Sequence, residues 1–84
     1  MTITVRFFAA LRETVGVAVV RVESGPESDL AQLLTMLRGR LSHEAFSALS
    51  AANVRIAVNK EFIEGGCALH DGDEVAFMPP ITGG

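Results

Sequence analysis

The feature that most constrains the fold is one stripe of leucines at helical spacing. Its members fall at positions i, i+3, i+4 and i+7 and are Leu30, Leu33, Leu34 and Leu37. This spacing predicts a helix with a single apolar face, from which Gln32 and Arg38 point away. Such a helix needs a second layer to cover its apolar face. Because the chain has only 84 residues, it can build one core and no more.

Both ends of this helix carry candidate signals. Either Ser24, with Glu27 three residues on, or Ser28 is predicted to cap its N-terminus. Gly39 is predicted to end it. After Ser42, a weaker apolar pattern indicates either a second helical segment or a loop wrapped on the core, and it consists of Leu41, Ala45, Phe46 and Leu49.

Strand patterns lie on both sides of the leucine helix. Residues 2–8 alternate apolar and polar side chains, and residues 17–22 are rich in β-branched side chains, which predicts two paired strands. A short helix over residues 9–13, ended by a turn at Gly16, is predicted between them. Later strands are predicted at residues 54–58, with a short extension over 61–63 after a turn at Asn59 and Lys60, and at residues 74–78.

The predicted order is β-β-α-β-(β)-β, with the leucine helix crossing between the second and third long strands. A mixed sheet packed on that one main helix is the simplest way to bury the leucine stripe. We therefore expect an α+β protein with the β-grasp (ubiquitin-like) arrangement. Residues 1–84 form a single domain, in which residues 79–84 are an extended C-terminal tail, because Pro79 and Pro80 have no N–H to donate to a sheet.

Composition and charge exclude several classes of function. Seven Lys and Arg against ten Asp and Glu give a net charge of −3, which argues against nucleic-acid binding. The longest apolar stretch falls far short of the roughly 18 residues of a membrane span, and no signal peptide precedes the first strand, so a cytoplasmic location is expected. Cys67 is the only cysteine, so the chain alone forms neither a disulfide nor a cysteine-based metal site.

The last residues carry the most chemistry. Pro79 and Pro80 favour a stiff, extended segment, and Gly83 and Gly84 lack a Cβ, so the backbone could enter a narrow channel. An α-carboxylate at Gly84 resists nucleophiles until an enzyme converts it to a mixed anhydride with a nucleotide, after which sulfur or an amine could take the acyl carbon. The alternative is a frayed chain end that happens to finish in glycine.

Three groups of residues give the chain a family resemblance. They are Phe7-Phe8-Ala9 with Arg12-Glu13, Val58-Asn59 with Leu69 and Asp71 to Phe77, and Pro79-Pro80-Ile81-Thr82-Gly83-Gly84. Together they resemble the small, sulfur-carrying subunits of molybdopterin synthase over nearly the whole chain. The closing segment is the most specific part, and Met78 stands where that family often has an aromatic residue.

The resemblance implies a sulfur donor rather than an independent enzyme. It implies that a ubiquitin-activating-type enzyme adenylates Gly84 with ATP, that the product becomes a thiocarboxylate, and that no cofactor is bound permanently. It also implies that the tail, with Pro80, Ile81, Thr82 and Gly83, inserts into a large catalytic subunit. There it donates sulfur to a cyclic pyranopterin phosphate, in an assembly of two small and two large subunits.

A docking face can be predicted from strand alternation. If Ile3, Val5, Phe7, Val75 and Phe77 face the helix, then Phe8 and Met78 face away from it. Apolar side chains on an outer sheet face are typical of a partner surface, and Phe62 is predicted to join them. Each could equally be a single exposed hydrophobe. Arg12 is predicted either to meet a partner carboxylate or to cap its own short helix.

Other candidate groups are weaker. Cys67 with His43 and His70 could form a nucleophile and base, but Cys67 is better explained as a small core residue. The acidic residues Asp71, Asp73 and Glu74 are interpreted as turn residues, because the ligand spacing of a calcium-binding loop is absent. No metal site is predicted.

Two rival interpretations remain open. One is another β-grasp carrier, either of the thiamine pathway or a protein modifier, although the Phe7-Phe8-Ala9 start and the Pro-Pro-x-Thr-Gly-Gly ending argue against the thiamine type. The other is a β-grasp binding module that never uses its terminus. One residue added after Gly84 discriminates the second, because a binding module would tolerate it.

Overall fold

The computed structural model describes residues 1–79 of the chain. Its elements are, in chain order, β1 (Thr2–Phe7), α1 (Ala10–Val15), β2 (Val19–Glu23), α2 (Leu30–Arg40), α3 (His43–Leu49), β3 (Arg55–Val58), β4 (Glu61–Ile63) and β5 (Glu74–Met78). Every predicted strand and helix is therefore present. The segment after Ser42 is the helix α3 and not a wrapped loop, because the Ser42 hydroxyl accepts a hydrogen bond from the Ala45 N–H at 3.0 Å and caps it.

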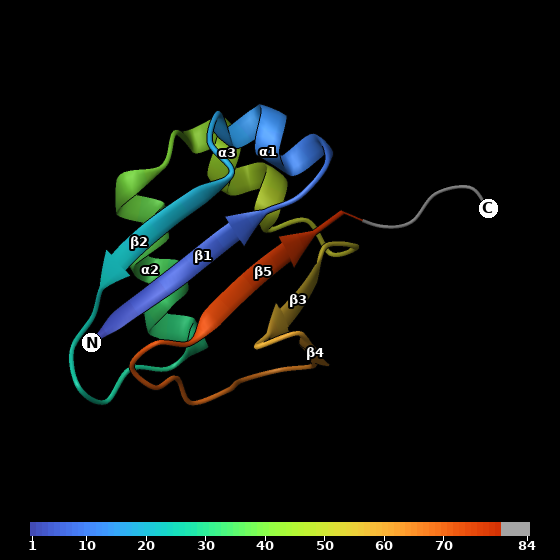
Figure 1. Cartoon of the computed structure of the whole chain (residues 1–84). Coiled ribbons are helices and arrows are strands. Elements are labelled where there is room, and N and C mark those ends of the chain that lie inside the picture. Colours follow the sequence, from blue (N-terminus) through green and yellow to red (C-terminus); the bar gives the residue numbers. More distant parts are fainter. Residues whose placement is uncertain (80–84) are drawn as a thin grey trace.

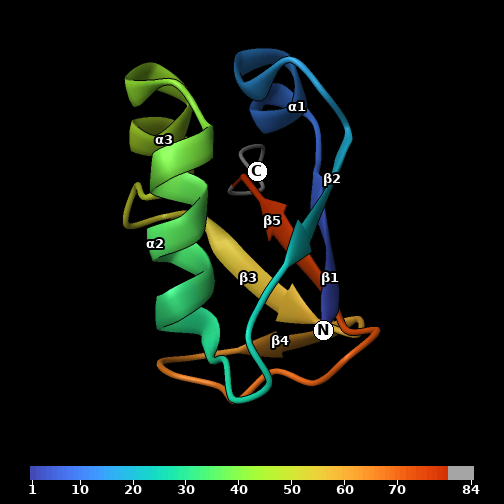
Figure 2. The same cartoon turned by 90° about the vertical axis from the view of Figure 1, so that its left-hand side faces the viewer.

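The five strands form one mixed sheet in the order β2-β1-β5-β3-β4 (Figure 1). The two central strands, β1 and β5, run parallel, and all other pairs are antiparallel. Figure 2 shows α2 and α3 standing on one side of this sheet. The predicted β-grasp fold is thus confirmed, and β5 lies in the middle of the sheet, where both of its neighbours hold it.

The core lies between α2 and one face of the sheet. Leu33 and Leu37 are fully buried and Leu30 nearly so, while Leu34 packs half-buried at the edge. The facing strand residues are also buried and are Ile3, Val5, Phe7, Val75 and Phe77. Phe7 and Phe77 are register partners across β1 and β5, and their rings stack with centroids 5.9 Å apart. The leucine stripe and the strand alternation therefore predict the core correctly.

The predicted ends of α2 are wrong. The hydroxyls of Ser24 and Ser28 hydrogen-bond each other, so neither caps the helix, and Asp29 accepts from the Gln32 N–H at 2.8 Å instead. The helix also passes through Gly39 and ends after Arg40. Leu41 ends it in an extended conformation while its side chain packs against the core.

The β1–β2 connection also differs slightly from the prediction. Residues 17 and 18 precede β2, which begins at Val19, although the Ala18 carbonyl still accepts from the Phe7 N–H at 2.9 Å. Gly16 ends α1 in the left-handed conformation, with φ of 97°, as the predicted turn there requires. Within residues 1–79, no helix has the length and apolarity needed to cross a membrane.

Gly39→Ala is expected to stabilise the protein by about 0.5 to 1 kcal/mol, because alanine loses less backbone entropy than glycine inside a helix. A Cβ added at Gly39 meets nothing within 4 Å. Gly16 is the matched control: a Cβ there is equally free, but its φ is +97°. Gly16→Ala should therefore destabilise by about 1 kcal/mol or more. Urea unfolding measures both, and a loss of stability for Gly39→Ala would contradict the prediction.

Candidate functional site

The face of the sheet turned away from α2 carries the candidate site. Successive strand residues alternate between faces, so the neighbours of the core residues in β5 and β4 lie on this outer face. Met78 pairs with Arg55 across β5 and β3, and Phe62 pairs with Ala57 across β4 and β3. Phe62 is 53% exposed, and Met78 is half-buried. Met78 thus lies on the face that strand alternation predicts, and Phe62, which was expected to join it, lies on the same face.

Phe8 extends the same face beyond the end of β1. Its N–H donates to the Phe77 carbonyl at 3.2 Å, so the β1–β5 ladder continues for one residue. Because Phe7 is the register partner of Phe77, Phe8 falls in the row of Met78. Its side chain is 44% exposed. Ala9, with φ of 51°, then turns the chain into α1. Phe8, Met78 and Arg55 therefore follow one another across three strands.

Two small buried residues, Ala57 and Ala76, lie at the centre of this face. Ala57 and Ala76 are register partners and are 2% and 7% exposed, although both lie on the side away from the helices. Neither alanine was predicted from the sequence to be a site residue. Their signal was present, because they alternate with the core residues Ile56, Val75 and Phe77. We call the set of Phe8, Arg55, Ala57, Phe62, Ala76 and Met78 the outer-face patch. Because the two alanines are almost inaccessible to water, the surface that the patch offers to another molecule consists of its larger side chains, Phe8, Arg55, Phe62 and Met78.

Charged residues flank and enter this patch. Arg6 donates through Nε to Glu74 Oε2 at 2.7 Å, and both side chains are partly exposed. Such a surface pair contributes little stability, but its two charges cancel. The guanidinium of Arg55 lies 4.0 Å from the centroid of the Phe62 ring. This contact was not predicted from the sequence, because it depends on the register of β3 with β4.

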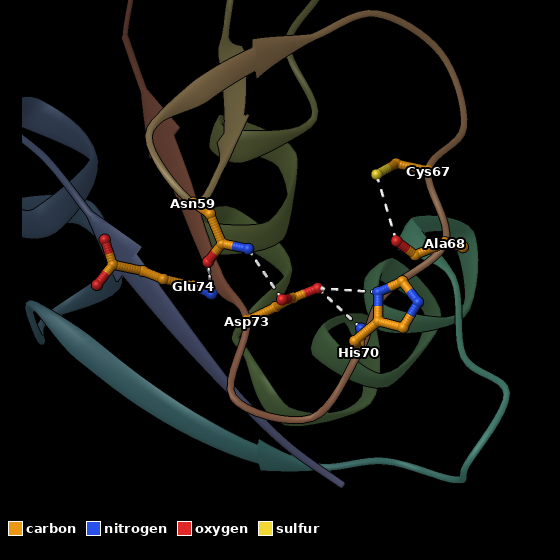
Figure 3. A network of polar contacts seen from close by, with 6 residues as sticks. All are labelled: Asn59, Cys67, Ala68, His70, Asp73 and Glu74. Atoms are coloured by element: carbon orange, nitrogen blue, oxygen red, sulfur yellow. Dashed lines mark hydrogen bonds and ion pairs between the residues drawn. The ribbon is translucent and has the colours of Figure 1, made fainter.

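A two-residue turn holds Phe62 in place. Asn59 and Lys60, with φ of 50° and 72°, join β3 to β4 in the tight geometry of a β-hairpin. The Asn59 side chain donates to Asp73 Oδ1 at 2.9 Å and accepts from the Glu74 N–H at 3.0 Å (Figure 3). It thereby ties the hairpin to the start of β5.

The acidic residues before β5 stabilise the turn that leads into this strand, as predicted. Asp73 accepts through Oδ2 from the His70 N–H at 2.8 Å, and Asp71 accepts from the Thr2 N–H at 2.7 Å. Within residues 1–79, no three His, Cys, Asp or Glu side chains gather as a metal site. The carboxylates of Asp71 and Asp73 instead accept hydrogen bonds from backbone N–H groups and from the Asn59 side chain.

The structure does not join Cys67 to a histidine base. The Cys67 thiol donates to the Ala68 carbonyl at 3.4 Å, whereas the His70 Nδ1 lies 3.8 Å from Asp73 Oδ2 (Figure 3). His43 begins α3 and lines a surface hollow with Arg38 and Phe46. Cys67 packs half-buried against the core, which agrees with its interpretation as a core residue.

One predicted site residue, Arg12, lies apart from the outer-face patch, and the others fall outside residues 1–79. Arg12 is an exposed residue of α1, a helix that contacts α3 and β1, and the α1 C-terminus is capped by the backbone of Gly16. The remaining predicted residues lie outside the described part of the chain and are Pro80, Ile81, Thr82, Gly83 and Gly84. Pro79, which precedes them, directly follows the central strand β5.

The mixed sheet on one main helix, with its strand order, defines a ubiquitin-like β-grasp protein. The chain belongs to the ThiS family, whose model matches residues 5–84. The molybdopterin synthase sulfur carrier subunit of Escherichia coli is 37% identical over 82 residues, which cover 98% of this chain and 99% of that protein.

Solved structures agree with this assignment. SAMP1 from Haloferax volcanii, a protein also titled small archaeal modifier protein 1, is 28% identical with a TM-score of 0.80 and full coverage of both chains. A chain from the complex of subunits 1 and 2 of the molybdopterin-converting factor of Helicobacter pylori is 26% identical. Its TM-score is 0.74, again with full coverage of both chains.

Asn59→Gly is expected to lower the free energy of unfolding by about 1 to 2 kcal/mol. The substitution removes both side-chain hydrogen bonds but keeps a residue that tolerates positive φ. Lys60→Gly is the matched control, since Lys60 lies in the same turn with φ of 72° and an exposed side chain. Chemical denaturation compares them, and equal stability of the two variants would show that the Asn59 side chain contributes nothing.

Proposed function

We propose that this chain is the sulfur carrier subunit of molybdopterin synthase and that Gly84 carries the sulfur as a thiocarboxylate. The observation that carries the proposal is the position of β5. This strand lies at the centre of a ThiS-family β-grasp sheet, beside the outer-face patch, and leads directly into Pro79-Pro80-Ile81-Thr82-Gly83-Gly84. The 37% identity to the Escherichia coli sulfur carrier subunit supports the same role.

Activation of Gly84 follows from carboxylate chemistry. A carboxylate oxygen attacks the α-phosphorus of ATP, pyrophosphate leaves, and the resulting acyl-adenylate has a good leaving group. A sulfur donor then displaces AMP and leaves a thiocarboxylate. In this proposal a ubiquitin-activating-type enzyme binds the ATP, the chain itself holds no permanent cofactor, and the reaction takes place in the cytoplasm, where ATP is available. Gly83 keeps the stem narrow enough to enter both partners.

Sulfur donation requires a second partner, the large catalytic subunit. In the proposed step the thiocarboxylate sulfur bonds to a carbon of cyclic pyranopterin monophosphate, and water then cleaves the acyl–sulfur bond. The sulfur stays on the pterin, and the oxygen of that water completes the Gly84 carboxylate. The Helicobacter pylori complex of subunits 1 and 2 supports such a pairing, which we extend to two small and two large subunits. We assign the docking contacts to Phe8, Phe62 and Met78, with Arg12 at the side and Pro80, Ile81 and Thr82 along the tail.

A second candidate function is protein modification. The similarity to small archaeal modifier protein 1 favours it, because a modifier also activates its terminal carboxylate. The two functions differ only in the acceptor: sulfur in the first, a lysine amine in the second. A thiamine-type carrier would form the same thiocarboxylate, but it would not bind the large subunit. A binding module would form neither product.

Intact-mass spectrometry of the chain isolated with its activating enzyme tests the carrier chemistry. We expect a species heavier by the difference between a sulfur and an oxygen atom. Gly83→Val should abolish this species and leave the unfolding midpoint unchanged, because Gly83 follows the strand that completes the core. Gly25→Val, at an exposed loop position where a Cβ meets nothing, is the matched control.

An isopeptide adduct in that experiment would favour the modifier instead. A chain extended by one residue after Gly84 should give no thiocarboxylate. If the extended chain still restored molybdoenzyme activity in cells lacking the native protein, the carrier proposal would be wrong.

Met78→Lys is expected to weaken binding to the large subunit at least about tenfold, because it brings an unpaired charge into an apolar contact. Val17→Lys is the matched control, since Val17 is 47% exposed but lies outside the outer-face patch. Isothermal titration calorimetry measures both affinities. Equal affinities for the two variants would remove Met78 from the interface.

A further inference from the structure

Arg55 is a lone cation within the outer-face patch. Its guanidinium stacks 4.0 Å from the centroid of the Phe62 ring, and its register partner in β5 is Met78. Within residues 1–79, the ion pairs join Arg6 to Glu74 and His70 to Asp73, so no carboxylate pairs with Arg55. Two more arginines lie on the same sheet face, outside the patch: Arg6 is paired with Glu74, and Arg21 lies on the edge strand β2 as the register partner of Thr4. Among residues 1–79, Arg55 is therefore the one charged side chain of the patch, and no carboxylate of these residues compensates it.

Docking of a partner changes the solvation of the Arg55 guanidinium, and with it the free energy of binding. In the free protein, water solvates the exposed guanidinium, and the Phe62 ring attracts it by a weak cation–π contact. A partner that covers Phe62 and Met78 also removes water from Arg55, because Arg55 lies between them in the sheet. A guanidinium without water needs an anionic acceptor, and a carboxylate matches its paired N–H groups in plane.

We propose that Arg55 is a specificity-determining residue and that the partner surface it fits is apolar with one carboxylate placed to meet its guanidinium. The partner is the large subunit of molybdopterin synthase, so the inference rests on the proposed function and adds the chemistry of the contact. An apolar surface without that carboxylate would bind Phe62 and Met78 but would leave the charge of Arg55 without water and without an ionic partner. Arg55 thereby discriminates between partners that the apolar residues alone would accept.

The chain contains a matched control for this proposal. Arg38 lies over the ring of Phe46 at 5.4 Å, in the same kind of stacking. That pair belongs to α2 and α3, on the opposite side of the sheet from the outer-face patch (Figure 2). Substitution of Arg38 removes an exposed stacked arginine and one positive charge without touching the patch.

Calorimetry of the full chain with the purified large subunit, at low and high salt, tests the proposal. Arg55→Gln should weaken binding at least about tenfold and flatten the salt dependence, and Arg55→Glu should weaken it further. Arg55→Met keeps an apolar stem on Phe62 but lacks the charge, so it should lose affinity as Arg55→Gln does. Arg38→Gln should bind as the native chain does. Thermal unfolding checks that each variant is folded.

Different outcomes overturn the inference and the proposed function. The inference is wrong if Arg55→Gln binds as tightly as Arg38→Gln, or if Arg55→Met binds more tightly than the native chain, because then no carboxylate meets Arg55. If Met78→Lys still weakens binding in that case, the proposed docking face remains correct. If Met78→Lys also binds as the native chain does, the docking face itself is wrong, and the inference falls with it. Recovery of Arg55→Glu binding by an Asp→Arg or Glu→Arg change in the large subunit would identify the carboxylate.

Discussion

Burial of one leucine stripe against one face of the sheet determines most of this structure. Leu33 and Leu37 are fully buried, and the strand residues opposite them are equally inaccessible to water. A chain of 84 residues has enough apolar side chains for one such contact. The sheet is therefore covered on one side, and strand alternation decides which side chains remain on the other. The outer-face patch is a consequence of how the core is built.

The central position of β5 connects this core to the proposed chemistry. Because β1 and β3 both hydrogen-bond to β5, the strand end at Met78 is fixed relative to Phe8 on one side and Arg55 on the other. An edge strand would have left that end attached on one side only. The residues that follow β5 therefore start from a defined point beside the apolar patch. A partner that binds the patch is at the same time positioned at the beginning of the tail.

Much of this could be predicted from the sequence, because leucine spacing and strand alternation are local patterns. The core side of β1 and β5, and hence the outward direction of Met78, followed from them. The cap of α2 did not: Ser28 suits a cap, but in the fold its hydroxyl meets Ser24. The stacking of Arg55 on Phe62 also needs the register of two strand pairs, which no local pattern encodes. Gly39 was misjudged because contacts of the following residues, such as Leu41 with the core, decide where the helix ends.

The charges on the sheet explain how one face could serve two partners in turn. In the proposed function both the activating enzyme and the large subunit act on Gly84, so we expect both to approach the end of β5 and to exclude each other. Such exchange requires contacts that are specific without being permanent. Half-exposed apolar residues such as Phe8 and Phe62 supply moderate affinity. The charge of Arg55, which pairs with no carboxylate within residues 1–79, adds discrimination, because it penalises any apolar surface that lacks a carboxylate.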